Sequence, residues 1–126
     1  MPRKPQDETT ILFSSGTTGN PKGIPWDQTT PIKSAGDGYL HHDIHAGDIV
    51  CWPTNLGWMM GPWLVYAALI NDATIALSDA VPTSRRFCEF VQNAGVTMLG
   101  LVPSIVSAWR SQETTAGLDW SHIKVF

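Results

Sequence analysis

The chain has 126 residues, of which 43% are hydrophobic and 15% charged, and its formal net charge at pH 7 is −3. This length suffices for one domain with an apolar core, and the slightly acidic balance gives no electrostatic support for binding nucleic acid. No apolar run reaches the roughly 18 residues of a membrane span, and residues 1–8 lack the apolar stretch of a secretory signal. Cys51 and Cys88 are interpreted as free thiols that pack as small apolar side chains, with a disulfide as the alternative.

The first predicted element is a short buried strand at residues 11–13, Ile-Leu-Phe. A loop rich in glycine and hydroxyl side chains follows it. Glycines let backbone N–H groups face an anion without a Cβ in the way, hydroxyls donate further hydrogen bonds, and a lysine adds a compact positive charge. A flexible surface turn is the alternative, but the strand, the donors and the lysine together favour a phosphate-binding loop. The residues predicted to contact phosphate are Ser14, Ser15, Gly16, Thr17, Thr18, Gly19 and Lys22.

The spacing of this loop excludes two common phosphate-binding motifs. The Walker A motif needs a lysine directly after its second glycine, whereas Lys22 stands three positions after Gly19 and is followed by Gly23. The dinucleotide-binding motif begins Gly-x-Gly, whereas two threonines separate Gly16 from Gly19. The loop therefore belongs to some other class of phosphate site.

After the loop, residues 23–26 fit a short strand. A helix is predicted to begin with Thr29 or Thr30 as its N-cap and to run to about His41. Two glycines inside this helix lower its intrinsic propensity. The next strand is predicted at residues 49–52.

From residue 49 onward, predicted strands and helices alternate. The strands are expected at 49–52, 74–77, 96–102 and 123–126, and the helices at 59–69, at 82–94 and from Pro103. This order predicts an α/β fold, part of a doubly wound and mostly parallel sheet with flanking helices, preceded by the phosphate-binding hairpin. Ligands of such sheets bind at the carboxyl ends of the strands, which directs attention to residues 53–61.

A group of histidines lies near the end of the first predicted helix. His41, His42 and His45 stand close to Asp43, but their spacing is not that of a zinc site, and adjacent residues point in different directions on a regular element. We interpret the group as a solvated helix end and predict no metal site. Asp48 is interpreted as a turn or cap residue.

Two segments resemble motifs of the adenylate-forming superfamily, which includes acyl-CoA synthetases, luciferases and the adenylation domains of peptide synthetases. Residues 15–23, Ser-Gly-Thr-Thr-Gly-Asn-Pro-Lys-Gly, resemble its signature loop. Residues 55–61, Asn-Leu-Gly-Trp-Met-Met-Gly, resemble a second motif in the form that acetyl-CoA synthetases carry, and residues 43–48 are similar to the turn before it. Asn55 stands where the family often has Asp, and Pro62 where it often has His. These departures leave the acyl substrate open.

The resemblance implies an enzyme that activates a carboxylic acid with ATP and Mg²⁺ to an acyl-adenylate and then forms a thioester with coenzyme A. It also implies that the loop holds the β- and γ-phosphates of ATP, with Thr18 and Lys22 as catalytic residues. The acyl pocket that it implies is walled by Trp58, Met59, Met60 and Gly61. Core packing is the alternative for these side chains. For the whole protein, an adenylation domain that delivers to an amine or a carrier protein and a non-catalytic α/β nucleotide-binding module remain open.

Members of this superfamily are several times longer than 126 residues. We therefore expect residues 1–126 to be a piece of the large N-terminal domain, with residues 1–10 as a linker or disordered segment and without the C-terminal lid domain. The missing remainder of the polypeptide would then be its main protein partner, and the isolated piece is expected not to turn over. The expected location is intracellular, cytoplasmic or organellar with the peroxisome included, and the sequence does not decide among these.

Overall fold

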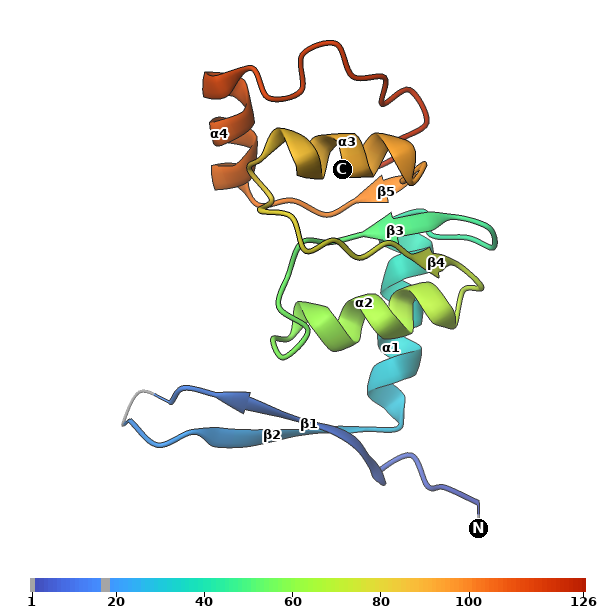
Figure 1. Cartoon of the computed structure of the whole chain (residues 1–126). Helices are drawn as coiled ribbons and strands as arrows, with labels where there is room; N and C mark the ends of the chain where they lie inside the picture. Colours follow the sequence, from blue (N-terminus) through green and yellow to red (C-terminus); the bar gives the residue numbers. More distant parts are fainter. Residues whose placement is uncertain (1, 17–18) are drawn as a thin grey trace.

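The computed structural model describes residues 2–16 and 19–126. It consists of a β-hairpin followed by a parallel sheet with helices on both faces (Figure 1). The elements follow one another as β1 (Glu8–Ser14), β2 (Lys22–Asp27), α1 (Thr29–His41), β3 (Ile49–Cys51), α2 (Met60–Leu69), β4 (Thr74–Ile75), α3 (Arg85–Asn93), β5 (Met98–Leu99) and α4 (Pro103–Gln112).

The sheet has the strand order β4-β3-β5 within the described residues, and both pairings are parallel. Val125 extends it through an isolated parallel bridge to Met98, so the last segment lies beside β5 where a strand was expected. The α/β class with a parallel sheet is thus confirmed, although the strands after β2 are shorter than predicted. Val50 and Cys51 of β3 and both residues of β5 are buried between layers of helices, as is usual in parallel sheets, whereas Thr74 of the edge strand β4 is exposed.

Two apolar cores cover the two faces of the sheet. Side chains alternate along a strand, so Val50 and its neighbour Cys51 enter different cores. The first core packs against α2 around Leu64, and the second packs against α3 and α4 around Phe87. In Figure 1, α1 and α2 accordingly lie on one side of the sheet, and α3 and α4 on the other.

Both cysteines are buried and free, as the sequence indicates. Cys51 lies on β3, where burial raises the pKa of its thiol to about 12. Burial also raises the pKa of the Cys88 thiol on α3. Both side chains are therefore neutral packing groups at physiological pH.

The hairpin corrects two expectations. β1 begins at Glu8, whereas residues 1–10 were expected to be a linker or disordered. The strand is longer because Glu8 pairs with Asp27 across the hairpin and the Thr9 hydroxyl donates to the carbonyl of Trp26 at 3.0 Å. The N-cap of α1 is also not a threonine but Gln28, and the Asp27 carboxylate just before it accepts from the N–H of Thr29 at 2.9 Å.

The two glycines of α1 lie in different surroundings, and this gives a paired prediction. A Cβ at Gly36 would meet nothing within 4 Å, whereas a Cβ at Gly38 would lie 2.9 Å from the Cβ of Ala67 on α2. Gly36→Ala should raise the free energy of unfolding by about 0.5–1 kcal/mol through helix propensity. Gly38→Ala should lower it by about 1–3 kcal/mol through overpacking. Chemical denaturation of both variants measures the difference, and equal shifts of the same sign would contradict the α1–α2 packing described here.

Asp48, at the turn before β3, joins distant parts of the chain. Its carboxylate accepts from the N–H of His45 at 2.9 Å and from the Thr97 hydroxyl at 2.8 Å, and it pairs with the Lys124 ammonium at 2.6 Å. Burial alone would raise the pKa of this carboxyl, but the hydrogen bonds from Lys124, His45 and Thr97 together hold it below its ordinary value. The interpretation of Asp48 as a turn residue therefore covers only part of its role.

Asp48→Asn is expected to lower the free energy of unfolding by about 1–3 kcal/mol at pH 7, the usual effect of losing a buried hydrogen bond to a charged group. Because the pKa of Asp48 is lower in the folded state, its stabilisation is present at neutral pH and is lost as the pH falls below roughly 4. Chemical denaturation at neutral and acidic pH should therefore show wild type and variant converging in acid. Asp79→Asn is the control, because Asp79 is 84% exposed in its pair with Arg86. An Asp48→Asn effect no larger than the control would contradict the network.

Candidate nucleotide and acid site

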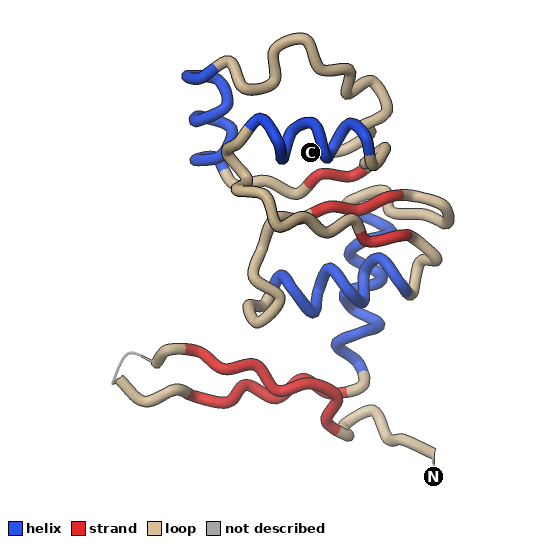
Figure 2. The backbone as a smooth tube through the Cα atoms, in the orientation of Figure 1, coloured by secondary structure: helices blue, strands red, loops and turns tan. Residues whose placement is uncertain are grey.

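The glycine-rich loop lies at the tip of the β1–β2 hairpin. Ser14 pairs with Lys22 at the last rung of the ladder, so residues 15–16 and 19–21 lie beyond the paired strands (Figure 2). Gly16 and Gly19 have φ angles of +64° and +87°, which favour glycine. A Cβ at Gly16 would also overlap the carbonyl oxygen of Asn20. Both glycines are thus required by the backbone path of the loop.

The side chains at the base of the loop are open to an incoming anion. Ser15 and Lys22 are exposed, and Ser14 is half-buried. Within residues 2–16 and 19–126, the Lys22 ammonium has no ion pair or side-chain hydrogen bond, so its charge is free to meet a ligand. Thr17 and Thr18 lie outside the described residues, and their phosphate contacts stay predictions.

The second motif forms a tight turn between β3 and α2. The Asn55 side-chain oxygen accepts from the N–H of Gly57 at 2.8 Å, and its carbonyl accepts from the N–H of Trp58 at 2.9 Å. Either Asp or Asn provides the side-chain oxygen for such a turn, so the departure at Asn55 preserves the local geometry. Gly61 is buried, and a Cβ there would overlap the backbone of Leu56. The turn therefore requires glycine at position 61.

An open cleft of about 460 Å³ separates the hairpin from this turn. The residues that line it are Leu12, Phe13, Ser14, Ser15, Ile24, Gly57, Trp58 and Met59. Ser14 and Ser15 of the loop thus face the same space as Trp58 and Met59. The last two side chains are 70% and 62% exposed, so the core-packing alternative does not hold for them in this structure.

The other two residues predicted for the acyl pocket lie elsewhere. Met60 is half-buried and borders a neighbouring groove of about 520 Å³, which it shares with Met59, Trp26 and Trp63. Gly61 lines neither space, because it is buried beneath the turn. Of the four residues predicted for the acyl pocket, Trp58 and Met59 therefore share a cleft with the loop. Met60 lies at the neighbouring groove, and Gly61 packs beneath the turn.

Several wall residues were missed by the sequence analysis. Phe13 and Ile24 are 70% and 46% exposed on the hairpin, although residues 11–13 were predicted to be buried. A two-stranded hairpin has no second layer of its own, and recognising this would have indicated exposed apolar side chains. Trp63 follows Met59 by four residues and falls on the same side of α2. Its indole offered no sequence signal beyond ordinary helix packing.

The histidines are arranged as a helix end. His45 Nε2 lies 2.7 Å from an Asp43 carboxylate oxygen at the surface. The His42 ring packs edge-on against Trp63, with the ring centroids 5.0 Å apart, and burial lowers its pKa. Among the described residues, no group of three or more His, Cys, Asp and Glu side chains is arranged to hold a metal ion.

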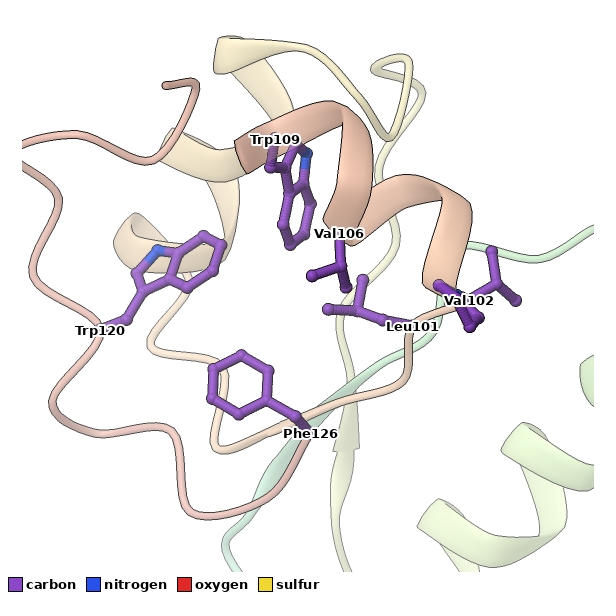
Figure 3. Close-up of a pocket in the computed structure, with 7 residues that line it drawn as sticks. Leu101, Val102, Val106, Trp109, Trp120 and Phe126 are labelled. Atoms are coloured by element: carbon purple, nitrogen blue, oxygen red, sulfur yellow. The ribbon is translucent and has the colours of Figure 1, made fainter. Parts of the chain in front are cut away.

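A separate apolar pocket of about 440 Å³ lies between α4 and the last segment of the chain (Figure 3). Its lining residues are Leu101, Val102, Pro103, Val106, Trp109, Trp120 and Phe126. In Figure 1, α4 lies at the opposite end of the molecule from the hairpin, and the pocket contains no predicted site residue. It is therefore distinct from the cleft beside the glycine-rich loop.

Known structures share this arrangement. The N-terminal domain of FACL13 from Mycobacterium tuberculosis matches with a TM-score of 0.75 and 23% identity, covering 94% of this chain and 29% of that one. A luciferase-like enzyme from the mealworm Zophobas morio matches with a TM-score of 0.77 and 16% identity, covering 98% and 28%. At these identities the likeness concerns the fold alone.

The chain belongs to the AMP-binding enzyme family, whose model matches residues 1–126. It is 62% identical over 118 residues to hexanoyl-CoA synthase of Cannabis sativa, and 57% identical over 118 residues to probable acyl-activating enzyme 17, peroxisomal, of Arabidopsis thaliana. Each match covers 94% of this chain but 16% of the relative. The chain thus spans about a sixth of the length of these curated relatives. The predicted superfamily is confirmed.

Proposed function

We propose that this chain is part of the large domain of an AMP-forming acyl-CoA synthetase. The observation that carries the proposal is one shared space. A glycine-rich loop with Lys22, which has no ion pair within the described part of the chain, opens beside an apolar cleft walled by Trp58 and Met59. A polyphosphate and an apolar carboxylic acid are the two ligands that such a pair of surfaces suits. The names of the relatives, which include hexanoyl-CoA synthase and acetyl-coenzyme A synthetase, support the same reaction class.

In the proposed first step, a carboxylate oxygen of the acid attacks the α-phosphorus of ATP, the bond to the β-phosphate oxygen breaks, and pyrophosphate leaves. Negative charge grows on the leaving phosphates, and fixed donors that face it lower the barrier. We assign this task to Lys22, to the backbone N–H groups around Gly16 and Gly19, and to the hydroxyls of Thr17 and Thr18. Mg²⁺ is assigned to the substrate, because substrate phosphates commonly hold this ion, and it would neutralise part of the same charge.

The acyl chain is assigned to the cleft between the hairpin and the second motif. Trp58 and Met59 would contact its methylene groups, and Phe13 would form the opposite wall. Each methylene removed from water contributes about 0.8 kcal/mol to binding, so the depth of the cleft would favour particular chain lengths. Met60 and Trp63 would matter only for acids long enough to reach the neighbouring groove.

In the proposed second step, the thiol of coenzyme A gives up its proton to solvent and attacks the acyl carbon of the adenylate, and AMP leaves with the electron pair of the broken bond. We propose coenzyme A as the acceptor because the relatives' names state it. Carrier proteins and amines are the other candidates, and thioester formation on adding coenzyme A would separate them. No helix of the described chain is long and apolar enough to cross a membrane. Two relatives are named peroxisomal, so the peroxisome is the proposed location.

Acid-dependent ATP–pyrophosphate exchange tests the proposal directly. The enzyme that contains this chain would be purified at full length and assayed with carboxylic acids from two to about eighteen carbons. We expect exchange with at least one acid, and acyl-CoA formation when coenzyme A is added. A folded enzyme that shows no exchange with any acid of the panel would contradict the proposed function.

A further inference from the structure

One side-chain contact ties the hairpin to the body of the domain. Thr10 Oγ1 on β1 and the Tyr66 hydroxyl on α2 lie 2.7 Å apart and share a hydrogen bond, although 56 positions separate them in sequence. Within the described chain, it is the one hydrogen bond that joins the hairpin strands to α2. Both side chains are half-buried, which shields the bond from competing water.

The hairpin has little else to fix its direction. A two-stranded ribbon is marginally stable alone, and Ile11, Phe13 and Ile24 are about half or more exposed. Its base is held where the Asp27 carboxylate accepts from the N–H of Thr29 at the start of α1, and Figure 1 shows the rest extending past α2 toward the loop. A hairpin attached at its base alone can pivot about that base. The Thr10–Tyr66 hydrogen bond is a second attachment, to α2, and it restricts this pivoting.

The bond lies on a direct route between the two predicted binding surfaces. Thr10, Leu12 and Ser14 alternate onto one face of β1, so Ser14 is on the Thr10 face about 13 Å further along. Tyr66 lies two helical turns after Met59, on the same side of α2. The bond therefore couples the strand that carries the glycine-rich loop to the helix that directly follows the cleft-wall residues Trp58 and Met59.

We propose that Thr10 and Tyr66 are positioning residues, whose hydrogen bond holds the glycine-rich loop in register with the cleft during acid activation. This inference rests on the proposed function. Neither side chain lines the cleft, so both act through the hairpin. Loss of the bond lets the loop swing away from the leaving pyrophosphate. Attack of a thiol on preformed acyl-adenylate breaks no bond to pyrophosphate and does not depend on that register.

The test uses Tyr66→Phe, Thr10→Val and the double variant in the full-length enzyme. Tyr39→Phe is the matched control, because Tyr39 is on α1, is 52% exposed, and its hydroxyl makes no hydrogen bond to another described residue. Each single variant should slow ATP–pyrophosphate exchange by about 2- to 12-fold, the kinetic equivalent of one neutral hydrogen bond. The double variant should be slower than either single variant by less than about 2-fold, because both remove the same bond.

Two further readouts separate positioning from general destabilisation. Acyl-CoA formation from preformed acyl-adenylate should stay within about 2-fold of wild type in all variants, whereas loss of folded enzyme would lower both half-reactions equally. Amide hydrogen exchange across β1 and β2 should be faster in Tyr66→Phe and unchanged in Tyr39→Phe.

Three results would each overturn the inference. The variants could lose both half-reactions equally, or the double variant could be slowed by the product of the two single effects. The amide hydrogen exchange of β1 and β2 could also stay unchanged in Tyr66→Phe. If the wild-type enzyme activates no acid, the proposed function fails. The hydrogen-exchange comparison then still decides whether the bond holds the hairpin.

Discussion

Lys22→Ala is expected to lower acid-dependent ATP–pyrophosphate exchange by about 10- to 100-fold, the range for losing a charged donor that faces developing negative charge. Lys22 ends the loop at the last rung of the hairpin, is exposed, and has no ion pair among the described residues. Its removal should therefore cost little stability. The effect should appear in kcat and in KM for ATP, while the KM for the carboxylic acid changes by less than about 2-fold.

Lys4→Ala is the control for the loss of one exposed positive charge outside the loop. Lys4 is also exposed, and among the described residues it forms hydrogen bonds through its own backbone atoms and not through its ammonium. Activity of Lys4→Ala should equal that of wild type. Lys22→Arg should recover part of the activity, because it restores the charge with a different donor geometry. If Lys22→Ala instead raised the KM for the acid and left ATP use unchanged, the lysine would serve the acid, and its assignment to phosphate would be wrong.

Gly61→Ala is expected to impair the binding and activation of the carboxylic acid. A Cβ at this buried position would overlap the backbone of Leu56, and backbone cannot move aside as a flexible side chain can. The turn that carries Trp58 and Met59 must shift, so the free energy of unfolding should fall by about 1–3 kcal/mol. A misplacement near 1 Å can lower a rate by about 100-fold, so kcat/KM for the acid should fall by about 10- to 100-fold, with the KM for ATP changed by less than about 3-fold.

The matched control for Gly61→Ala is Gly36→Ala, which adds the same methyl group to a helix where nothing lies within 4 Å. Thermal unfolding and acid titrations of both variants give the comparison. Gly36→Ala should leave acid activation unchanged. If Gly61→Ala lowered stability without a selective effect on the acid, the turn would have no part in acid binding, and the cleft would lose its proposed ligand.

The fold was largely predictable from the sequence because its periodic signals are local. The alternation of apolar segments and turns from Ile49 onward predicted a parallel sheet, which the order β4-β3-β5 bears out. The boundaries were less predictable. Apolar residues 96–102 suit a strand, yet the paired strand β5 spans only Met98–Leu99, because its partner Cys51 is the last residue of β3. Strand length depends on the partner, which local sequence does not encode.

The site was predictable as two motifs but not as one cleft. The glycines, the hydroxyl side chains and Lys22 indicated an anion-binding loop, and the family resemblance of residues 55–61 indicated a second binding segment. That Ser14 and Met59 border the same space depends on how the hairpin lies against α2. The Thr10–Tyr66 hydrogen bond links the hairpin to α2 across 56 positions of the sequence. Neither of its two residues stands out in the sequence. Contacts of this kind follow from tertiary packing and carry no local pattern.

The central claim is that the loop between β1 and β2 holds the polyphosphate of ATP. A crystal structure of the full-length enzyme with Mg²⁺ and a non-hydrolysable ATP analogue measures this most directly. We predict that the β- and γ-phosphate oxygens lie within hydrogen-bonding distance of the Lys22 ammonium and of backbone N–H groups near Gly16 and Gly19. A triphosphate bound at another place, with this loop free of it, would contradict the account.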